Sequence, residues 1–162
     1  MENSLSWAGH ELTMTVLMTP DMANFAGNVH GGTVLKYLDS VAYACASRYC
    51  GSYVVTLSVD QVLFLEPIHV GELVTFLATV NYTGTSSMEV GIRVVAENIR
   101  QRSTRHANSS YFTMVAVDEN RRPLPVPPLD PVTEEQQMRY EKAVQRRRAR
   151  RSAQEGGPAH SG

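Results

Sequence analysis

The residues best placed to do chemistry lie in one stretch, Asn24–Asp39, with the sequence NFAGNVHGGTVLKYLD. Its middle part, His30-Gly31-Gly32, leads directly into a helical pattern. Free backbone N–H groups at a helix N-terminus attract negative charge, and glycines let a substrate approach the backbone closely. The amides of Gly31 and Gly32 could therefore hold a developing oxyanion. A tight turn explains the same glycines equally well, and the sequence alone leaves the two interpretations even.

Asp39 lies at the border of the apolar stripe of that helix, beside Leu35, Ala42 and Ala46. A carboxylate next to small residues on a nearly buried face is unfavourable unless it is paired or used. General base catalysis is one such use. The pattern favours this role slightly over that of an ordinary solvated helix carboxylate.

Two polar residues precede the glycines. Asn28 tolerates left-handed backbone conformations, so a turn residue is one interpretation. In the other, its amide orients a water or polarises a carbonyl, although it cannot act as a base. His30 could shuttle a proton, but a single His before Gly-Gly is more often a hydrogen-bonding group of the loop.

Several other functions are disfavoured. The chain has no G-x-S-x-G motif, no metal-ligand spacing of His, Cys and Asp, and no Walker or dinucleotide glycine pattern. Cys45 and Cys50 are expected to be reduced thiols in or near the core. The net charge of −1 indicates neither a nucleic acid nor a membrane partner. The five arginines between 146 and 151 are interpreted as a solvated helix end.

The periodicity predicts one strand, one helix and then four strands. The helix begins at Gly31, runs for about five turns and ends at Gly51-Ser52. In 88–97, alternate residues from Met88 to Ala96 are apolar and face one way, while Glu89, Gly91, Arg93 and Glu97 face the other. This pattern predicts a half-buried strand. The expected strands are 11–18, 53–66 with a bulge near Asp60-Gln61, 73–82, 88–97 and 107–117.

This order predicts an α+β fold in which the sheet wraps around the helix and its edges need a partner. We divide the chain into an N-terminal extension (1–10), this domain (11–131), a charged helix (132–151) and a disordered tail (152–162). The N-terminus lacks the pattern of a secretory signal, and no apolar run approaches a membrane span, so a cytoplasmic location is expected.

Three stretches, AGNVHGGTVLKYLD, VVTLSVDQVLFLEPIHVGE and SSMEVGIRVVAENI, resemble the brain-type cytosolic acyl-CoA hydrolases and their bacterial single-domain relatives. The resemblance runs from about Leu12 to about Pro131. It implies a hotdog fold, a long helix wrapped by a curved antiparallel sheet. It also implies that two hotdog subunits pair edge to edge in a dimer and that three such dimers commonly form a hexamer. Acyl-CoA binds at the dimer interface in this family. The catalytic Asn and Asp of the family match Asn28 and Asp39.

The resemblance predicts hydrolysis of fatty acyl-CoA without a metal or redox cofactor. Gly31 and Gly32, with His30 beside them, polarise the thioester carbonyl, and Asp39 of the partner subunit activates water; an acyl-enzyme on Asp39 is the alternative path. Val59 and Phe64 are expected to line the acyl chain. Candidates for the CoA moiety are Arg48, Arg93, Ser86 and Ser87. The competing hypotheses are a hotdog protein that senses acyl-CoA without hydrolysing it and a structural protein that uses the arginine tail.

Overall fold

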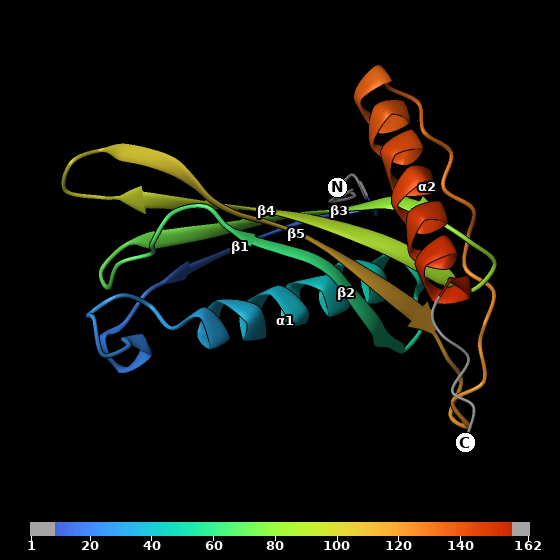
Figure 1. The fold of residues 1–162 in the computed structure, drawn as a ribbon, viewed down its shortest axis with the longest axis horizontal. Helices are drawn as coiled ribbons and strands as arrows, with labels where there is room; N and C mark the ends of the chain where they lie inside the picture. The colour runs from blue at the N-terminus through green and yellow to red at the C-terminus, as the bar shows by residue number, and fades with distance from the viewer. Residues whose placement is uncertain (1–8, 157–162) are drawn as a thin grey trace, which may run out of the picture.

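The computed structural model describes residues 9–156, which form one antiparallel sheet with a long helix against each side (Figure 1). The helices are α1 (Gly31–Cys50) and α2 (Glu134–Glu155), and a short 3-10 helix spans Pro20–Met22. The strands are β1 (Glu11–Leu17), β2 (Val54–Phe64), β3 (Leu73–Thr83), β4 (Ser87–Asn98) and β5 (Ser103–Ala116). The predicted order of elements is confirmed, and so is the α+β hotdog arrangement of a central helix against a five-stranded sheet.

The helix α1 supplies one side of the core. Its buried residues recur at helical spacing and pack against the inner face of the sheet, where Phe76, Val90 and Met114 are fully buried. Gly51 ends the helix with a left-handed φ of 69°, and its amide donates to the Ser47 carbonyl at 2.8 Å. The buried residues of α1 are Val34, Leu38, Val41, Ala42, Cys45 and Ala46.

The strands lie in the order β1-β3-β4-β5-β2, so β1 and β2 are the edges. β2 is hydrogen-bonded to β5 along one side only. Its register shifts between Val59 and Gln61, which confirms the bulge predicted near Asp60-Gln61. A second shift lies between Thr56 and Ser58.

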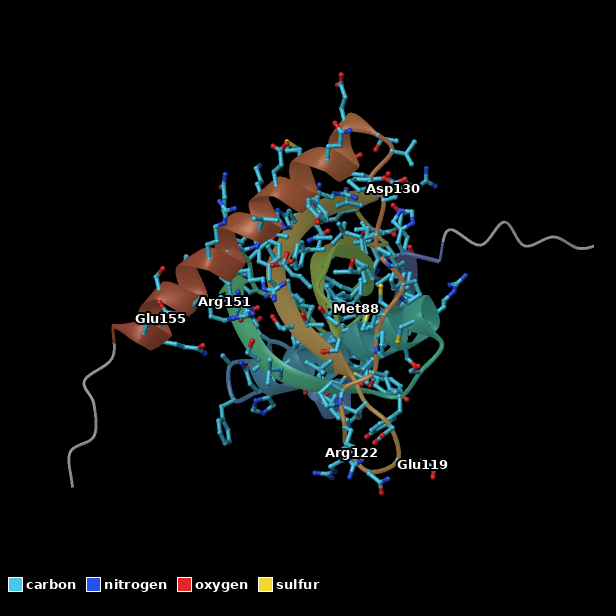
Figure 2. All side chains as sticks on the ribbon, turned by 90° about the vertical axis from the view of Figure 1, so that its right-hand side faces the viewer. Met88, Glu119, Arg122, Asp130, Arg151 and Glu155 are labelled. Carbon is cyan, nitrogen blue, oxygen red and sulfur yellow. The ribbon has the colours of Figure 1, made fainter. Side chains whose placement is uncertain are left out.

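The expected half-buried pattern of β4 is confirmed on its inner face and wrong on part of its outer face. Alternate residues from Met88 to Ala96 are buried against α1, as predicted. Glu89 and Gly91, expected to face solvent, are buried as well, while Arg93 is exposed. The reason is α2, which crosses the outside of the sheet diagonally, from the segment near Asp130 toward Glu155 (Figure 2).

The C-terminal helix differs from expectation in two ways. It continues through Ser152–Glu155, which were expected to belong to the disordered tail. Gly156 caps the helix. Residues 157–162 of that tail and residues 1–8 of the extension lie outside the described residues. The arginines were expected to be solvated, but Arg146, Arg147 and Arg150 contact side chains of the sheet. Composition suggests a solvated helix end, whereas here these guanidinium groups are paired with acceptors of the outer face.

No helix within residues 9–156 has the length and apolar character needed to cross a membrane.

Candidate active site

The loop before α1 is held in shape by Asn24. Its Oδ1 accepts hydrogen bonds from the backbone amides of Ala26 and Asn28, at 2.9 and 3.0 Å. Gly27 has a φ of +82°, a left-handed conformation that glycine adopts without strain. Because Asn24 Oδ1 is the acceptor, its Nδ2 group is left to donate, and it has no hydrogen-bond partner within residues 9–156.

The N-terminus of α1 follows this loop and is open. His30 is the N-cap residue, and its side chain makes no capping hydrogen bond. The first amides of a helix have no partner within the helix. Gly31 and Gly32, which carry two of these amides, are exposed. Both glycines are the first residues of α1 and do not form a separate tight turn. The two amides that the oxyanion prediction needs are therefore at an exposed helix end.

A hollow of ≈ 310 Å³ lies beside this helix end. Phe64, at the end of β2, forms part of its wall, and its ring carbon Cζ lies only 3.7 Å from where a side chain at Gly31 would begin. Asn24 and Asn28 face the same hollow. The structure thus brings Phe64, Gly31 and the asparagine loop together.

Asn28 is connected through His69 to the ion pair of Glu72, which is buried, and Arg105, which is half-buried. Asn28 Oδ1 lies 2.8 Å from His69 Nδ1, and the backbone amide of His69 donates to Glu72 Oε2 at 2.8 Å. Arg105 donates to both carboxylate oxygens of Glu72, at 2.5 and 2.8 Å. Burial alone would raise the pKa of the Glu72 carboxyl, but the bonds from Arg105 and the His69 amide outweigh burial and lower that pKa. The ion pair of Glu72 thus stabilises the turn that carries His69, and His69 in turn contacts Asn28 in the loop before α1.

Asp39 lies elsewhere on α1. It is eight residues beyond Gly31, a separation of about 12 Å along the helix axis. Its carboxylate Oδ1 accepts a hydrogen bond from Thr56 Oγ1 on β2 at 2.7 Å. Asp39 faces a second hollow, of ≈ 370 Å³, together with Tyr43 and Tyr53. In the single chain Asp39 is exposed, so the expectation of a nearly buried position is not met there.

The comparison with known proteins assigns the family. The profile of the Thioesterase superfamily matches residues 26–103. Protein VdlD of Helicobacter pylori is 52% identical over 140 residues, covering 86% of this chain and 80% of that protein. An uncharacterized acyl-CoA thioester hydrolase of Bacillus subtilis, YkhA, is 37% identical and covers 88% of this chain and 83% of that protein. The chain belongs to the acyl-CoA thioester hydrolases of the hotdog fold. The human cytosolic acyl coenzyme A thioester hydrolase is 34% identical over 86% of this chain, which spans 37% of that protein.

Solved structures of acyl-CoA hydrolases superpose on this thioesterase. An apo-hexameric acyl-CoA thioesterase has a TM-score of 0.85 at 38% identity, covering 88% of this chain and 92% of that one. The Staphylococcus aureus acyl-CoA hydrolase in complex with butyryl coenzyme A and coenzyme A has a TM-score of 0.82 at 32% identity, covering 89% and 88%. Variants of the S. aureus enzyme with an Asp, an Asn or a Thr replaced by Ala have also been solved.

The four residues expected to bind the CoA moiety do not surround Gly31 within one chain of the thioesterase. Arg48 lies in the last turn of α1, at the opposite end of the helix. Arg93 lies on the outer face of β4, in a hollow of ≈ 440 Å³ under α2. Ser86 and Ser87 lie at the turn between β3 and β4, where their carbonyls accept backbone hydrogen bonds. Their assignment to CoA stays a prediction.

The two cysteines of the thioesterase are free thiols, and neither takes part in the site. Burial raises the pKa of the Cys45 thiol to about 12, so this thiol remains protonated and is a poor nucleophile. Within residues 9–156, no group of three or more His, Cys, Asp and Glu side chains is arranged to hold a metal ion.

Sequence reasoning missed three residues of the site. Asn24 lies in the same Asn- and Gly-rich segment as Asn28, so its residue type was a usable signal. Thr56 reaches Asp39 from a strand 17 residues later in the chain, and His69 reaches Asn28 across 41 residues. Neither contact has a signal in the local sequence, because each depends on how β2 and the turn after it lie against α1.

Proposed function

We propose that this protein hydrolyses fatty acyl-CoA to a free fatty acid and coenzyme A in the cytoplasm, at a site shared by two subunits. The observation that carries the shared site is the separation within one chain. The open helix end with its asparagine loop faces one hollow, and Asp39 faces another. A partner subunit could bring its Asp39 to the first hollow. The name of the human relative, a cytosolic hydrolase, supports the location.

The edge strand β2 is the proposed contact between the two subunits. Its outer side has no strand beside it within residues 9–156, and large apolar side chains lie exposed along it. Leu57 is 64% exposed, Val59 48% and Phe64 52%. An exposed, apolar edge strand is a ready surface for pairing with another chain. Pairing of β2 with β2 of a second copy would satisfy its backbone groups and bury these side chains.

A trimer of such dimers is proposed by analogy with the relative that is described as hexameric. In a dimer with twofold symmetry, both subunits present the same surface, so two equivalent sites form. Val59 and Phe64 would then line the acyl chain between the subunits.

The proposed reaction uses charge stabilisation and a general base. The thioester carbonyl lies over the amides of Gly31 and Gly32, which stabilise the oxyanion as it forms. Asp39 of the partner subunit takes a proton from water, and the water oxygen attacks the carbonyl carbon. The tetrahedral intermediate collapses, the C–S bond breaks, and coenzyme A leaves as a thiolate that takes up the proton. The alternative, in which Asp39 attacks and forms an acyl-enzyme, would be detected as a mass increase of the protein during turnover.

Two asparagines are candidates for the amide of the site, Asn28 as predicted and Asn24. In the S. aureus enzyme, the substituted Asn precedes the substituted Asp by 15 residues, and the substituted Thr follows that Asp by 17. Asn24, Asp39 and Thr56 have the same types and the same spacing in this chain. We therefore place Asn24 Nδ2 beside the thioester oxygen, and Asn28, held by His69, as the residue that orients the loop.

Mixing two inactive variants tests the shared site. Asn24→Ala and Asp39→Ala are prepared separately with different affinity tags, unfolded, mixed equally and refolded together; a parallel mixture uses Asn28→Ala. About half of the dimers formed by random pairing are mixed, and in each of these one site receives neither mutation. Release of coenzyme A from a panel of acyl-CoAs of different chain length is measured.

Coenzyme A release by the refolded mixture of Asn24→Ala and Asp39→Ala should recover to roughly a quarter of the wild-type rate. Half of the dimers are mixed, and each mixed dimer has one intact site of two. If both residues act within one chain, every site still carries a mutation and nothing is recovered. A flat result in a mixture whose mixed dimers are demonstrated by tandem purification on both tags would refute the shared site. Absence of turnover in the wild-type protein with the whole panel would refute the hydrolase and favour a sensor of acyl-CoA.

A further inference from the structure

The bulge of β2 is fixed by its own side chain. Asp60 is the extra residue between Val59 and Gln61. The residue lies on the open edge, yet its side chain is only 15% exposed. Its carboxylate accepts hydrogen bonds from Ser58 Oγ and Thr113 Oγ1, each at 2.7 Å. A bulge bends a strand and redirects its side chains. The hydrogen bonds of Asp60 therefore stabilise one shape of the β2 edge.

The carboxylate of Asp60 is in turn bound by Arg150 of α2. Arg150 Nη1 donates to both oxygens of Asp60, at 2.9 and 3.1 Å, and also contacts Thr113 Oγ1. Burial alone would raise the pKa of the Asp60 carboxyl, but its bonds to Ser58, Thr113 and Arg150 lower that pKa, so the carboxylate stays charged. The pair is therefore a charge-assisted contact between the C-terminal helix and the edge strand.

The rest of α2 is attached to the middle of the sheet rather than to its edge. Arg146 donates to Glu89 on β4, and Arg147 donates to the Tyr82 hydroxyl on β3. Within residues 9–156, Arg150 provides the side-chain hydrogen bonds between α2 and β2. Through these three arginines, α2 spans the outer face of the sheet from β3 to the edge strand.

The position of the bulge matters because residues of the site lie on both sides of it. Thr56, which holds Asp39, lies four residues before Asp60, and Phe64, beside Gly31, lies four residues after it. A strand that shifts its pairing by one residue turns each side chain to the opposite face. An edge strand has a neighbour on one side only, so it resists such a shift less than a central strand.

We propose that Arg150 and Asp60 are positioning residues for the shared site: α2 holds the bulge of β2 and thereby sets the register in which this edge meets the partner subunit. The inference rests on the proposed function, because it assumes that the site lies at the β2 edge. In this proposal the arginine-rich helix α2 affects catalysis by positioning residues of β2, and it does not contact the substrate.

The test compares two arginines of the same helix. Arg150→Met removes the contact with Asp60, and Arg151→Met removes the same charge from an exposed residue that has no hydrogen bond or ion pair within residues 9–156. Asp60→Asn and the double variant Asp60→Asn/Arg150→Met complete the set, and Arg150→Lys restores the charge. The readouts are kcat and KM for acyl-CoA, and amide hydrogen exchange of Val59–Phe64.

Arg150→Met and Asp60→Asn should each lower kcat about ten-fold, because small displacements of reacting groups are costly in rate. The double variant should lose no more than Arg150→Met alone, since Asp60→Asn removes only the charge from a contact that Arg150→Met already breaks. Arg151→Met should match wild type, and Arg150→Lys should recover part of the loss. Amide exchange in Val59–Phe64 should be faster in Arg150→Met and unchanged in Arg151→Met.

Equal kcat values for Arg150→Met and Arg151→Met would overturn the inference. A fall in melting temperature of Arg150→Met with unchanged kcat would do the same, because it shows a structural contact only. If the wild-type protein does not hydrolyse acyl-CoA, the proposed function fails, but the exchange measurement still tests whether α2 fixes the bulge. Unchanged exchange in Arg150→Met would then overturn the inference by itself.

Discussion

Thr56 on β2 donates a hydrogen bond from its Oγ1 to Oδ1 of Asp39 on α1, at 2.7 Å. The bond joins the candidate base to the edge strand and fixes the orientation of its carboxylate. With Oδ1 occupied by Thr56, Oδ2 remains to accept a proton from water. The same bond means that a change in the geometry of β2 is transmitted to Asp39.

Substitution of Asp39 should abolish the base without unfolding the chain. Asp39→Asn keeps the shape and the bond from Thr56, and we expect kcat to fall by ~10²-fold or more, as for loss of a general base. Thr56→Val should reduce kcat by about ten-fold, because the carboxylate is then less well oriented, and Thr56→Ser should restore most of it. Steady-state kinetics measure these values, and circular dichroism verifies the fold. Near-normal kcat in a folded Asp39→Asn protein would exclude the role assigned to Asp39.

The two asparagines can be separated by a substitution that keeps their acceptor contacts. Asn24→Asp retains the Oδ1 that holds the amides of Ala26 and Asn28 but removes the Nδ2 donor. Asn28→Asp likewise retains the Oδ1 facing His69. If Asn24 donates to the thioester oxygen, kcat of Asn24→Asp should fall by ~10²-fold, the cost of losing one oxyanion donor. Asn28→Asp should stay within about ten-fold of wild type. The opposite ranking would return the role to Asn28, and equal losses would mean that both amides contact the substrate.

The fold followed from the sequence because its periods are regular. The apolar stripe of α1 and the alternation from Met88 to Ala96 each bury one face, and both were confirmed. Leu35, expected at the same stripe, is 38% exposed. The bulge near Asp60 was also visible, because a slip in alternation is a local feature. The position of Gly31 at the helix start followed from the same reasoning.

The contacts between distant segments could not be predicted in this way. The Arg146–Glu89 pair joins residues 57 apart, and the Arg150–Asp60 pair residues 90 apart. An arginine cluster on a helix looks the same in the sequence whether it faces water or a sheet. The exposure of Asp39 was missed for a related reason: a helical wheel gives the direction of a side chain but not how far the sheet extends around the helix.

The Glu72–Arg105 pair should make stability depend on pH. The pKa of Glu72 is lowered in the folded protein from its ordinary value of 4.5, so the unfolded chain binds the proton more readily. The stabilisation is therefore complete above pH 4.5 and is lost as the pH falls through the lowered pKa. Glu72→Gln should lower the free energy of unfolding by about 2 kcal/mol at pH 7, since it leaves Arg105 without its counter-charge. Urea denaturation from pH 7 to pH 3 measures the difference.

That difference between wild type and Glu72→Gln should shrink as the pH approaches 3. Glu135→Gln is the matched control, because its i,i+4 pair with Arg139 is exposed and should contribute less than about 0.5 kcal/mol at every pH. A gap between wild type and Glu72→Gln that stays constant over the whole range would show that the stabilisation does not come from the charge of Glu72.

Shortening the C-terminus should separate the part of α2 that packs from the part that does not. A chain ending after Arg151 loses Ser152–Gly162 but keeps Ala143, which is 1% exposed, and the arginines that contact the sheet. Its melting temperature and turnover should be nearly unchanged. Arg146→Met, in contrast, leaves the buried carboxylate of Glu89 without its counter-charge and with only the hydrogen bond from Asn81 Nδ2. It also removes the guanidinium from the Tyr111 ring, 3.7 Å away. We expect it to lose about 3 kcal/mol of stability, while Arg148→Met, at an exposed position of the same helix, loses almost none. Thermal melts of the three proteins measure these differences. Marked destabilisation by the truncation would show that Ser152–Gly162 pack against the protein. Equal melting temperatures for Arg146→Met and Arg148→Met would show that α2 is not held by its arginines.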